Sequence, residues 1–341
     1  MSESGRLRLV FVALALALPL SLLAALSLGS VPLPAAGVAR STLARLGLAG
    51  PSPLPEMGEV ILWSVRLPRV LIAALVGGGL AVVGASLQSL FRNPLADAGL
   101  LGVGPGAALG AVLAVNAGWA HERFLAMPLA ACAGALLALL LVYAIAHVGG
   151  RPTLSGLLLT GLAVSALAAA GTSVLLVATE EFRVRTVLFW LAGGLEGRGY
   201  EHLALAAAFV LPGALALLLL ARPLDVLSLG EEEAAALSLP VHGARILVFG
   251  LCALVAGPVT AVAGAVPFVG LVAPHALRAL VGPPSRRLLP ASFLAGAVLV
   301  VIADVAARSF GEYVELPLGS VTAFVGAPYV LLALRGQEGR G

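Results

Sequence analysis

The chain has 341 residues, of which 60% are hydrophobic and only 11% are charged, and its mean hydropathy is +1.06. Because a soluble globular domain carries about 25% charged residues, a water-soluble fold is excluded and lipid must be the solvent for most of the surface. The formal net charge of +3 is small and spread along the chain, without the basic stripe that would suggest nucleic-acid binding.

Two residue types limit the chemistry of the chain. All 20 basic residues are arginine, whereas a phosphate-binding loop for ATP needs a lysine, so any ATP chemistry must reside on another polypeptide. Cys132 and Cys252 lie in apolar runs and are expected to be small packing residues. The sequence has no HExxH motif and no Gly-x-Ser-x-Gly nucleophile elbow. We therefore expect no catalytic residue, no metal site and no cofactor.

Apolar segments recur along the whole chain and predict an all-α polytopic membrane protein with about ten transmembrane helices. The first follows Arg6 and Arg8 and is about twenty residues long, which favours a retained helix over a cleaved signal peptide. The segment at 268–282 is the short one, and whether it crosses fully is left open. The predicted spans are 9–29, 66–91, 98–116, 124–147, 154–178, 202–221, 243–265, 268–282, 288–309 and 317–335.

The longest polar connections are predicted at 30–65, 179–201 and 222–242, and no soluble domain boundary interrupts the chain. The Asn93-Pro94 pair predicts a tight turn after the second span. An even number of spans places both termini on one side of the membrane. Arginines near both ends of the chain indicate that this side is the cytoplasm.

Two stripes of small residues occur at helical spacing, one from Gly102 to Ala114 and one from Gly161 to Thr172. Small residues let membrane helices approach closely, and this explains the first stripe completely. The second stripe also carries the hydroxyls of Ser165 and Thr172. It is consistent either with helix packing or with the lining of a transport pathway.

Charged residues stand where a membrane helix is otherwise apolar. Arg66 and Arg69 open the second span three residues apart, on one helix face, where arginines often serve only as interfacial anchors. Asp304 and Arg308 are one turn apart and predict an intrahelical ion pair. An intramembrane acid can instead serve a proton relay in a secondary transporter, which the adjacent arginine argues against. His275 is expected to be a packed histidine rather than a ligand.

The segment 224–242 leaves the membrane between two apolar spans. Ser228 is predicted to cap a short helix whose first turn carries the acids Glu231 to Glu233, where the helix dipole favours them, and Pro240 ends it. Such a helix is either a surface for a soluble partner or a solvated linker.

At these segments the sequence resembles the FecCD-type permease family, from about Ser30 to Leu334. The resemblance is carried by six motifs in the family's order: RLPR, SLQSLFRNPLADAGLLGVGPGAALG, WLAGGL, LSLGEEEAAALSL, PFVGLVAPHALRALVG and ELPLGSVTAFVGAPY. Members of this family are the membrane subunits of ATP-driven importers for iron–siderophore, haem or cobalamin.

The resemblance implies a homodimer of ten-helix subunits in the inner membrane, with a central pathway at the two-fold axis and both termini cytoplasmic. It implies two ATP-binding cassette subunits on the cytoplasmic side. It also implies a substrate-binding protein, periplasmic or lipid-anchored, on the outer side. Transport then proceeds by alternating access, and the binding protein rather than the permease selects the chelate. An ion-gradient-driven secondary transporter is the alternative function.

The resemblance also implies roles for particular residues. Arg66, Arg69 and Arg308 would dock carboxylates of the binding protein at a partly solvated outer rim. Asn93 and Leu95, after the second span, and Leu154 and Ser155, opening the fifth, would form the inner gate, although the family often has two hydroxyls at the second position, where this chain has Thr153 beside Leu154. The cassette-coupling residues would fall between 225 and 239, as Leu227, Ser228, Leu229, Gly230, Glu231, Ala234 and Leu237.

Overall fold

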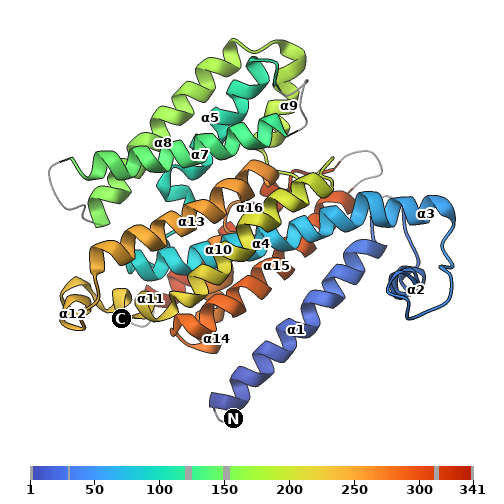
Figure 1. Cartoon of the computed structure of the whole chain (residues 1–341), viewed down its shortest axis with the longest axis horizontal. Coiled ribbons are helices and arrows are strands. Elements are labelled where there is room, and N and C mark those ends of the chain that lie inside the picture. Colours follow the sequence, from blue (N-terminus) through green and yellow to red (C-terminus); the bar gives the residue numbers. More distant parts are fainter. Residues whose placement is uncertain (1–2, 30, 120–124, 149–153, 311–314, 339–341) are drawn as a thin grey trace.

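The structure of the chain is a computed structural model that describes residues 3–29, 31–119, 125–148, 154–310 and 315–338. These residues form helices joined by turns, which confirms the predicted all-α class (Figure 1). The helices are α1 (Glu3–Ser27), α2 (Ala35–Arg45), α3 (Glu56–Val60), the π-helix η1 (Ile61–Arg66), α4 (Leu67–Phe91), the 3-10 helix η2 (Ala98–Leu101), α5 (Val103–Asn116), α7 (Ala126–Ala146), α8 (Leu154–Val177), α9 (Glu181–Leu191), α10 (Tyr200–Leu219), α11 (Ala221–Leu229), α12 (Glu231–Ala236), α13 (Val241–Ala263), α14 (Val269–Val281), α15 (Ser285–Ser309) and α16 (Leu318–Glu338).

Among the described residues, seven helices are long and apolar enough to cross a membrane, and three more apolar stretches are shorter. The prediction of a single short span was therefore incomplete, since Val103–Asn116 and Leu318–Leu332 join Val269–Val281 in the shorter group. The predicted span 98–116 is divided at Gly102, whose φ of 77° ends η2 before α5 begins. A helix as short as α5, with 14 residues, spans about 21 Å, less than the ~30 Å hydrocarbon core.

Two of the predicted polar connections contain helices. The connection 30–65 holds α2, α3 and η1, and the helix that contains the second span runs without a break from Glu56 to Phe91. The connection 179–201 holds α9. The polarity of both segments indicated that they lie outside lipid. It did not predict their helices, which make contacts with residues distant in the chain. In α2, for example, Ser41 Oγ accepts a hydrogen bond from Trp63 Nε1 at 3.0 Å, and the Arg45 guanidinium lies 4.4 Å from the Trp63 ring centroid.

The helix α4 is the centre of the bundle. In its apolar window 83% of the residues are buried, compared with 11% for α1, which lies at the edge of the bundle beside α15 (Figure 1). Helices α10, α13, α14 and α15 pack directly on α4. Glycine makes two of these contacts possible: a Cβ on Gly77 would lie 2.0 Å from the Gly296 carbonyl oxygen, and one on Gly84 would lie 1.8 Å from that of Gly270.

Residues of both small-residue stripes lie at contacts between helices. Gly106 packs on the Gly134 backbone and Gly110 on that of Ala130, so these two glycines of the first stripe join α5 to α7 by the close helix packing that was predicted. In the second stripe, Ser165 Oγ lies 3.5 Å from where a Cβ of Gly102 would stand, on the side of α8 that meets α5. Helix packing therefore accounts for the part of the second stripe that contains Ser165.

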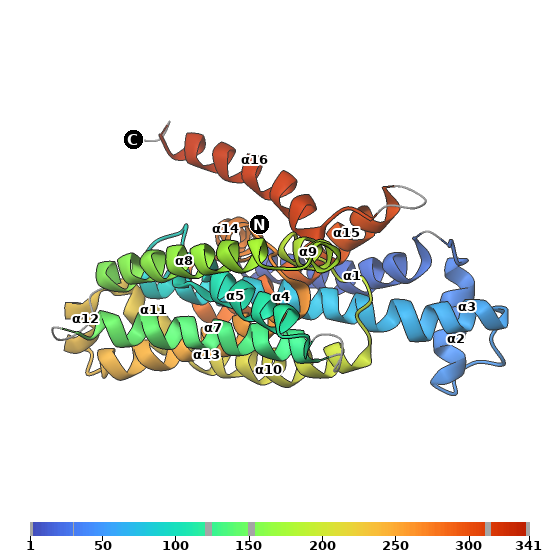
Figure 2. The same cartoon turned by 90° about the horizontal axis from the view of Figure 1, so that it is seen from above.

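The bundle has two distinct ends, called here the α2 end and the α12 end (Figure 1). Helix α1 ends and α4 begins near α2. At the opposite end α4 ends, α8 and α13 begin, and α11 and α12 lie. Helix α16 starts at the bundle and then leaves it, as Figure 2 shows, with α14 and α15 as its packing neighbours. Its outward course leaves Phe324 82% exposed in the single chain.

Gly84→Ala is expected to lower the stability of the folded chain by roughly 1–3 kcal/mol, because the added methyl group would force α4 away from the Gly270 backbone. Gly250→Ala is the matched control, since it makes the same change inside α13, where a Cβ meets no atom within 4 Å. Thermal unfolding in detergent measures both effects. Equal melting temperatures for the two variants would show that the α4–α14 contact does not require glycine.

Candidate functional site

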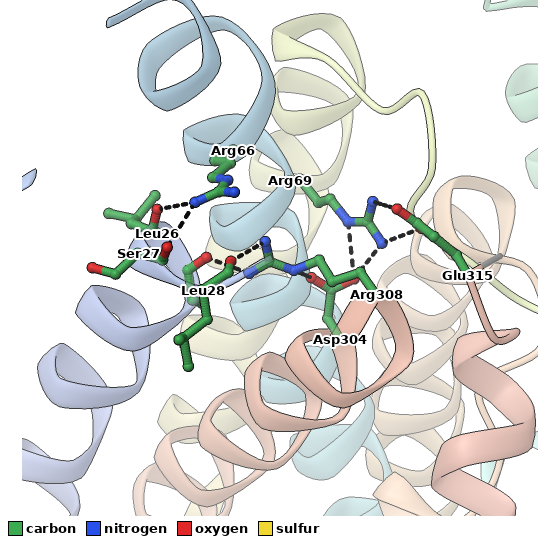
Figure 3. A network of polar contacts seen from close by, with 9 residues as sticks. Leu26, Ser27, Leu28, Arg66, Arg69, Asp304, Arg308 and Glu315 are labelled. Atoms are coloured by element: carbon green, nitrogen blue, oxygen red, sulfur yellow. Dashed lines mark hydrogen bonds and ion pairs between the residues drawn. The ribbon is translucent and has the colours of Figure 1, made fainter. Parts of the chain in front are cut away.

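Five charged side chains form a cluster at the α2 end, defined here as the arginine cluster: Arg66, Arg69, Asp304, Arg308 and Glu315 (Figure 3). They come from η1, α4, α15 and the residues just before α16. Three guanidinium groups and two carboxylates give the cluster a formal charge of +1. Because charges buried away from water are costly unless paired, the arrangement of partners decides what the cluster can do.

Arg69 is bound by both acids. Its Nε donates to Asp304 Oδ1 at 3.0 Å, while Nη1 and Nη2 donate to the two Glu315 oxygens at 3.0 Å and 2.8 Å. The Glu315 contact is thus the bidentate arrangement for which the planar guanidinium is suited. Asp304 Oδ2 also lies 3.1 Å from Arg308 Nε, which confirms the predicted intrahelical pair and makes Asp304 the bridge between the two arginines.

Arg66 and Arg308 instead hold the end of α1. The last carbonyls of a helix have no partner within the helix and carry partial negative charge, so arginine side chains are suited to bind them. Arg66 donates to the Leu26 oxygen at 2.8 Å and the Ser27 oxygen at 3.0 Å, and it also binds the Val31 oxygen. Arg308 donates to the Leu28 oxygen at 2.7 Å and also to that of Ala25.

Gly29 is what allows both arginines to approach the end of α1. Its φ of 145° lies in a region that residues with a side chain rarely adopt. A Cβ there would stand 2.8 Å from Arg308 Nη1 and 2.9 Å from Arg66 Nη2. The missing side chain therefore leaves the space that the two guanidinium groups fill.

The structure differs from the expected arginines at a partly solvated rim. Arg66 is only 5% exposed, Arg308 6%, and the Arg69 side chain 12%. Arg66 and Arg69 also turn toward different partners, Arg66 toward α1 and Arg69 toward α15 and Glu315 (Figure 3). Residues three apart on a helix differ by roughly 60° in direction, which is enough for long side chains to diverge when their partners lie on different sides.

The proposed inner-gate residues lie at the α12 end. Asn93 Oδ1 accepts a hydrogen bond from the Leu95 backbone N–H at 2.9 Å, which stabilises the predicted tight turn and leaves Leu95 39% exposed. Leu154 begins α8 and Ser155 is exposed beside it. Thr153 lies outside the described residues. The structure thus brings the two candidate gate segments to the same end of the bundle.

The segment 224–242 is helical in two pieces, and the predicted cap is wrong. Ser228 lies inside α11 and donates to the Asp225 carbonyl oxygen at 2.6 Å, and the short helix α12 starts after Gly230, whose φ is 138°. Helix α11 follows directly on α10, and its buried residues Ala221, Leu224 and Leu227 face the bundle. Pro240 does not end α12, which stops at Ala236, but stands immediately before α13.

The proposed coupling residues divide into two groups by exposure. Leu229 and Leu237 are 54% and 62% exposed, and Gly230 separates the two helices. Leu227 and Ala234 are buried against the bundle. Glu231 Oε1 forms an ion pair with Arg245 Nη2 of α13 at 2.5 Å. One face of the segment is therefore fixed to the bundle and the other is free for a partner.

Three functional candidates were missed at the sequence level. Asp225 accepts a hydrogen bond from the Ser285 backbone N–H at 2.7 Å and so joins α11 to the start of α15. Asp97 lines a cavity of about 300 Å³ bounded by the turn after α4 and the connection between α13 and α14. Glu315 belongs to the ELP motif but received no role. A single acidic residue forms no recognisable motif in one sequence, because the residues that it contacts in the fold are distant in the chain.

The two cysteines and His275 have the packing roles that the sequence predicted. Cys132 and Cys252 are buried free thiols. His275 makes an edge-to-face contact with Tyr329. Within the part of the chain that the structure describes, no group of three or more metal-ligating side chains is assembled.

The fold and the two polar ends of the bundle define a class of protein. Apolar helices long enough to cross a membrane surround a central glycine-rich helix, with an ion cluster at one end and a polar helical segment at the other. These are the features of a multi-pass membrane permease.

Comparison with known proteins identifies the family: residues 16–336 match the FecCD transport family. The cobalamin import system permease protein BtuC of Halobacterium salinarum is 40% identical over 312 residues, which cover 92% of this chain and 82% of that protein. The hemin transport system permease protein HmuU of Yersinia pestis is 39% identical over 281 residues, covering 81% of this chain and 84% of that protein. The chain belongs to the FecCD transport family, and it is a transport protein rather than an enzyme.

Two solved structures have a similar fold. A structure described as an inward-facing conformation of a metal-chelate type ABC transporter matches with a TM-score of 0.85 at 31% identity, covering 96% of this chain and 99% of the other. PsaBC from Streptococcus pneumoniae matches with a TM-score of 0.52 at 19% identity, which indicates a shared fold alone.

Gly29→Ala is expected to destabilise the attachment of α1 by about 1–3 kcal/mol, because the methyl group would displace the guanidinium groups of Arg66 and Arg308 from the α1 carbonyls. Gly47→Ala is the control: Gly47 also has a positive φ, of 72°, but a Cβ there meets no atom within 4 Å. Thermal unfolding of both purified variants separates backbone strain from collision with the arginines. Similar losses in the two variants would contradict the role assigned to Gly29.

Proposed function

We propose that this chain is the membrane-spanning permease subunit of an ATP-binding cassette importer that moves a metal chelate across the inner membrane, and that residues 1–341 form one permease domain. The observation that carries this proposal is the match of nearly the whole chain to the FecCD family together with a metal-chelate transporter fold. The relatives that are named as cobalamin and hemin permeases support a metal chelate of these classes as cargo, and iron–siderophore is the third class that we propose.

ATP hydrolysis belongs to a separate subunit in this proposal. The chain has no lysine for a phosphate-binding loop. The α12 end would then face the cytoplasm, with both termini on that side, as ten crossings require. Two cassette subunits would bind the exposed face of α11 and α12, defined by Leu229 and Leu237, while Leu227 and Ala234 pack inward and Glu231 binds Arg245.

A homodimer would place the transport pathway at its two-fold axis. The departure of α16 from the bundle supports this proposal, since apolar side chains on it are uncovered in the single chain, with Phe324 82% and Leu332 68% exposed (Figure 2). Alternating access would open the pathway at one end at a time. Asn93, Leu95, Leu154 and Ser155 would form the gate at the cytoplasmic end.

The arginine cluster would dock the substrate-binding protein at the opposite end. Its formal charge of +1 and its position at the α2 end support Arg66, Arg69 and Arg308 as the docking arginines. The secondary-transporter alternative loses its one candidate proton carrier, because Asp304 is 1% exposed and bound by two arginines.

The purified chain alone is expected to show no ATP hydrolysis, whereas its complex with the cassette subunit hydrolyses ATP and drives chelate uptake into proteoliposomes. A complex reconstituted with a cassette whose phosphate-loop lysine is replaced is the control for contaminating ATPases. Uptake driven by a proton or sodium gradient without ATP would contradict the proposed importer and favour the secondary transporter.

Replacing Leu229 and Leu237 together by glutamate is expected to abolish co-purification of the cassette subunit, because two exposed apolar contacts become charged. Leu46→Glu provides a control, since Leu46 is 66% exposed but follows α2, at the other end of the bundle. Pull-down from detergent extracts, with size-exclusion chromatography to confirm folding, measures the outcome. Retained cassette binding in the double variant would place the coupling surface elsewhere.

A further inference from the structure

We propose that Glu315 is an internal carboxylate that occupies the position on Arg69 where a carboxylate of the substrate-binding protein docks, so that docking exchanges one carboxylate for another. This inference rests on the proposed docking function of the arginine cluster. In this inference Arg69 alone exchanges its partner when the binding protein docks. Arg66 and Arg308 have a structural role, because they hold the end of α1.

Among the three arginines, Arg69 is the one whose bound carboxylate can be replaced by another carboxylate from solvent. The guanidinium groups of Arg66 and Arg308 are turned toward the carbonyls that end α1, and the two residues are only 5% and 6% exposed. Removing either from these carbonyls would leave buried backbone acceptors without donors, which is costly. Arg69 makes no such backbone contact among the described interactions, and its two Nη atoms point at Glu315 (Figure 3).

The two acids that bind Arg69 are not equivalent. Asp304 is 1% exposed and also pairs with Arg308, so its departure would leave two buried arginines without their shared carboxylate. The Glu315 side chain is 38% exposed and pairs with Arg69 alone in the cluster. A carboxylate that arrives from solvent can therefore replace Glu315 but not Asp304. The exchange keeps the bidentate geometry and the number of paired charges unchanged.

The backbone around Glu315 is held independently of its side chain. The Leu316 backbone N–H donates to the Ala307 oxygen at 2.9 Å, and that of Leu318 donates to the Gly193 oxygen at 2.9 Å. These bonds fix the start of α16 whether or not Glu315 contacts Arg69. Rotation of the Glu315 side chain into solvent is therefore sufficient to free the outer edge of Arg69.

The test is the affinity of the permease complex for the substrate-binding protein of its own transport system, measured in nanodiscs at several salt concentrations. Glu315→Gln keeps the shape of the side chain but removes the competing charge. It should raise the affinity roughly fivefold, the factor that corresponds to a partly exposed ion pair of about 1 kcal/mol. Glu180→Gln is the matched control, because it removes one negative charge from an exposed ion pair, with Arg183, after α8 and outside the cluster.

Two further variants separate this inference from the docking function itself. Arg69→Gln should weaken binding and flatten its salt dependence. If Arg69→Gln has no effect, the cluster does not dock the binding protein and the proposed function of these arginines fails. A different result would overturn the exchange alone. In that case Arg69→Gln weakens binding of the substrate-binding protein, but the affinity of Glu315→Gln is no higher than that of Glu180→Gln. Glu315→Asp, which shortens the side chain and keeps its charge, replaces Glu315→Gln if that variant does not fold, and it too should bind more tightly.

Discussion

The packing of the α2 end depends on the ion pairs that Asp304 forms with Arg69 and Arg308. The Asp304 carboxylate joins Arg69 of the central helix α4 to Arg308 of α15, and Arg308 in turn holds the end of α1. In lipid no water is present to satisfy a buried polar group, so every charge and every terminal carbonyl must find a partner within the protein. Asp304 allows Arg69 and Arg308 to be buried together, and Arg308, with Arg66, fixes the end of the peripheral helix α1, in whose apolar window only 11% of the residues are buried.

A second constraint, close contact of backbones, connects this end to the other. Glycines in α4 let α14 and α15 approach to backbone contact along its length, so the helix that carries Arg69 at one end and the Asn93 turn at the other is packed as a rigid central element. The segment formed by α11 and α12 is fixed to this bundle through Asp225 and Glu231. Glu231 thus connects α12 directly to α13, whereas Asp225 connects α11 to the start of α15.

Most of the bundle could be predicted from the sequence because membrane helices are specified locally. A span needs about twenty apolar residues, and the stripe from Gly102 to Ala114 needs only a partner with small residues, as α7 provides. Local patterns were insufficient where a helix depends on a distant contact. Helix α2 needs the Trp63 side chain, and the break at Gly230 rather than a cap at Ser228 depends on how α11 packs on α4 and α15.

The sequence by itself determined the membrane class, the approximate spans and, through its motifs, the family. Only the tertiary structure decided what the charged residues do. Arg66, Arg69 and Arg308 looked alike as arginines near helix ends, yet two of them bind the carbonyls of α1 and the third binds two acids more than two hundred residues away in the chain. The physical reason is that a guanidinium group binds any suitably placed oxygen, so its role is set by which oxygens the folded chain brings within reach.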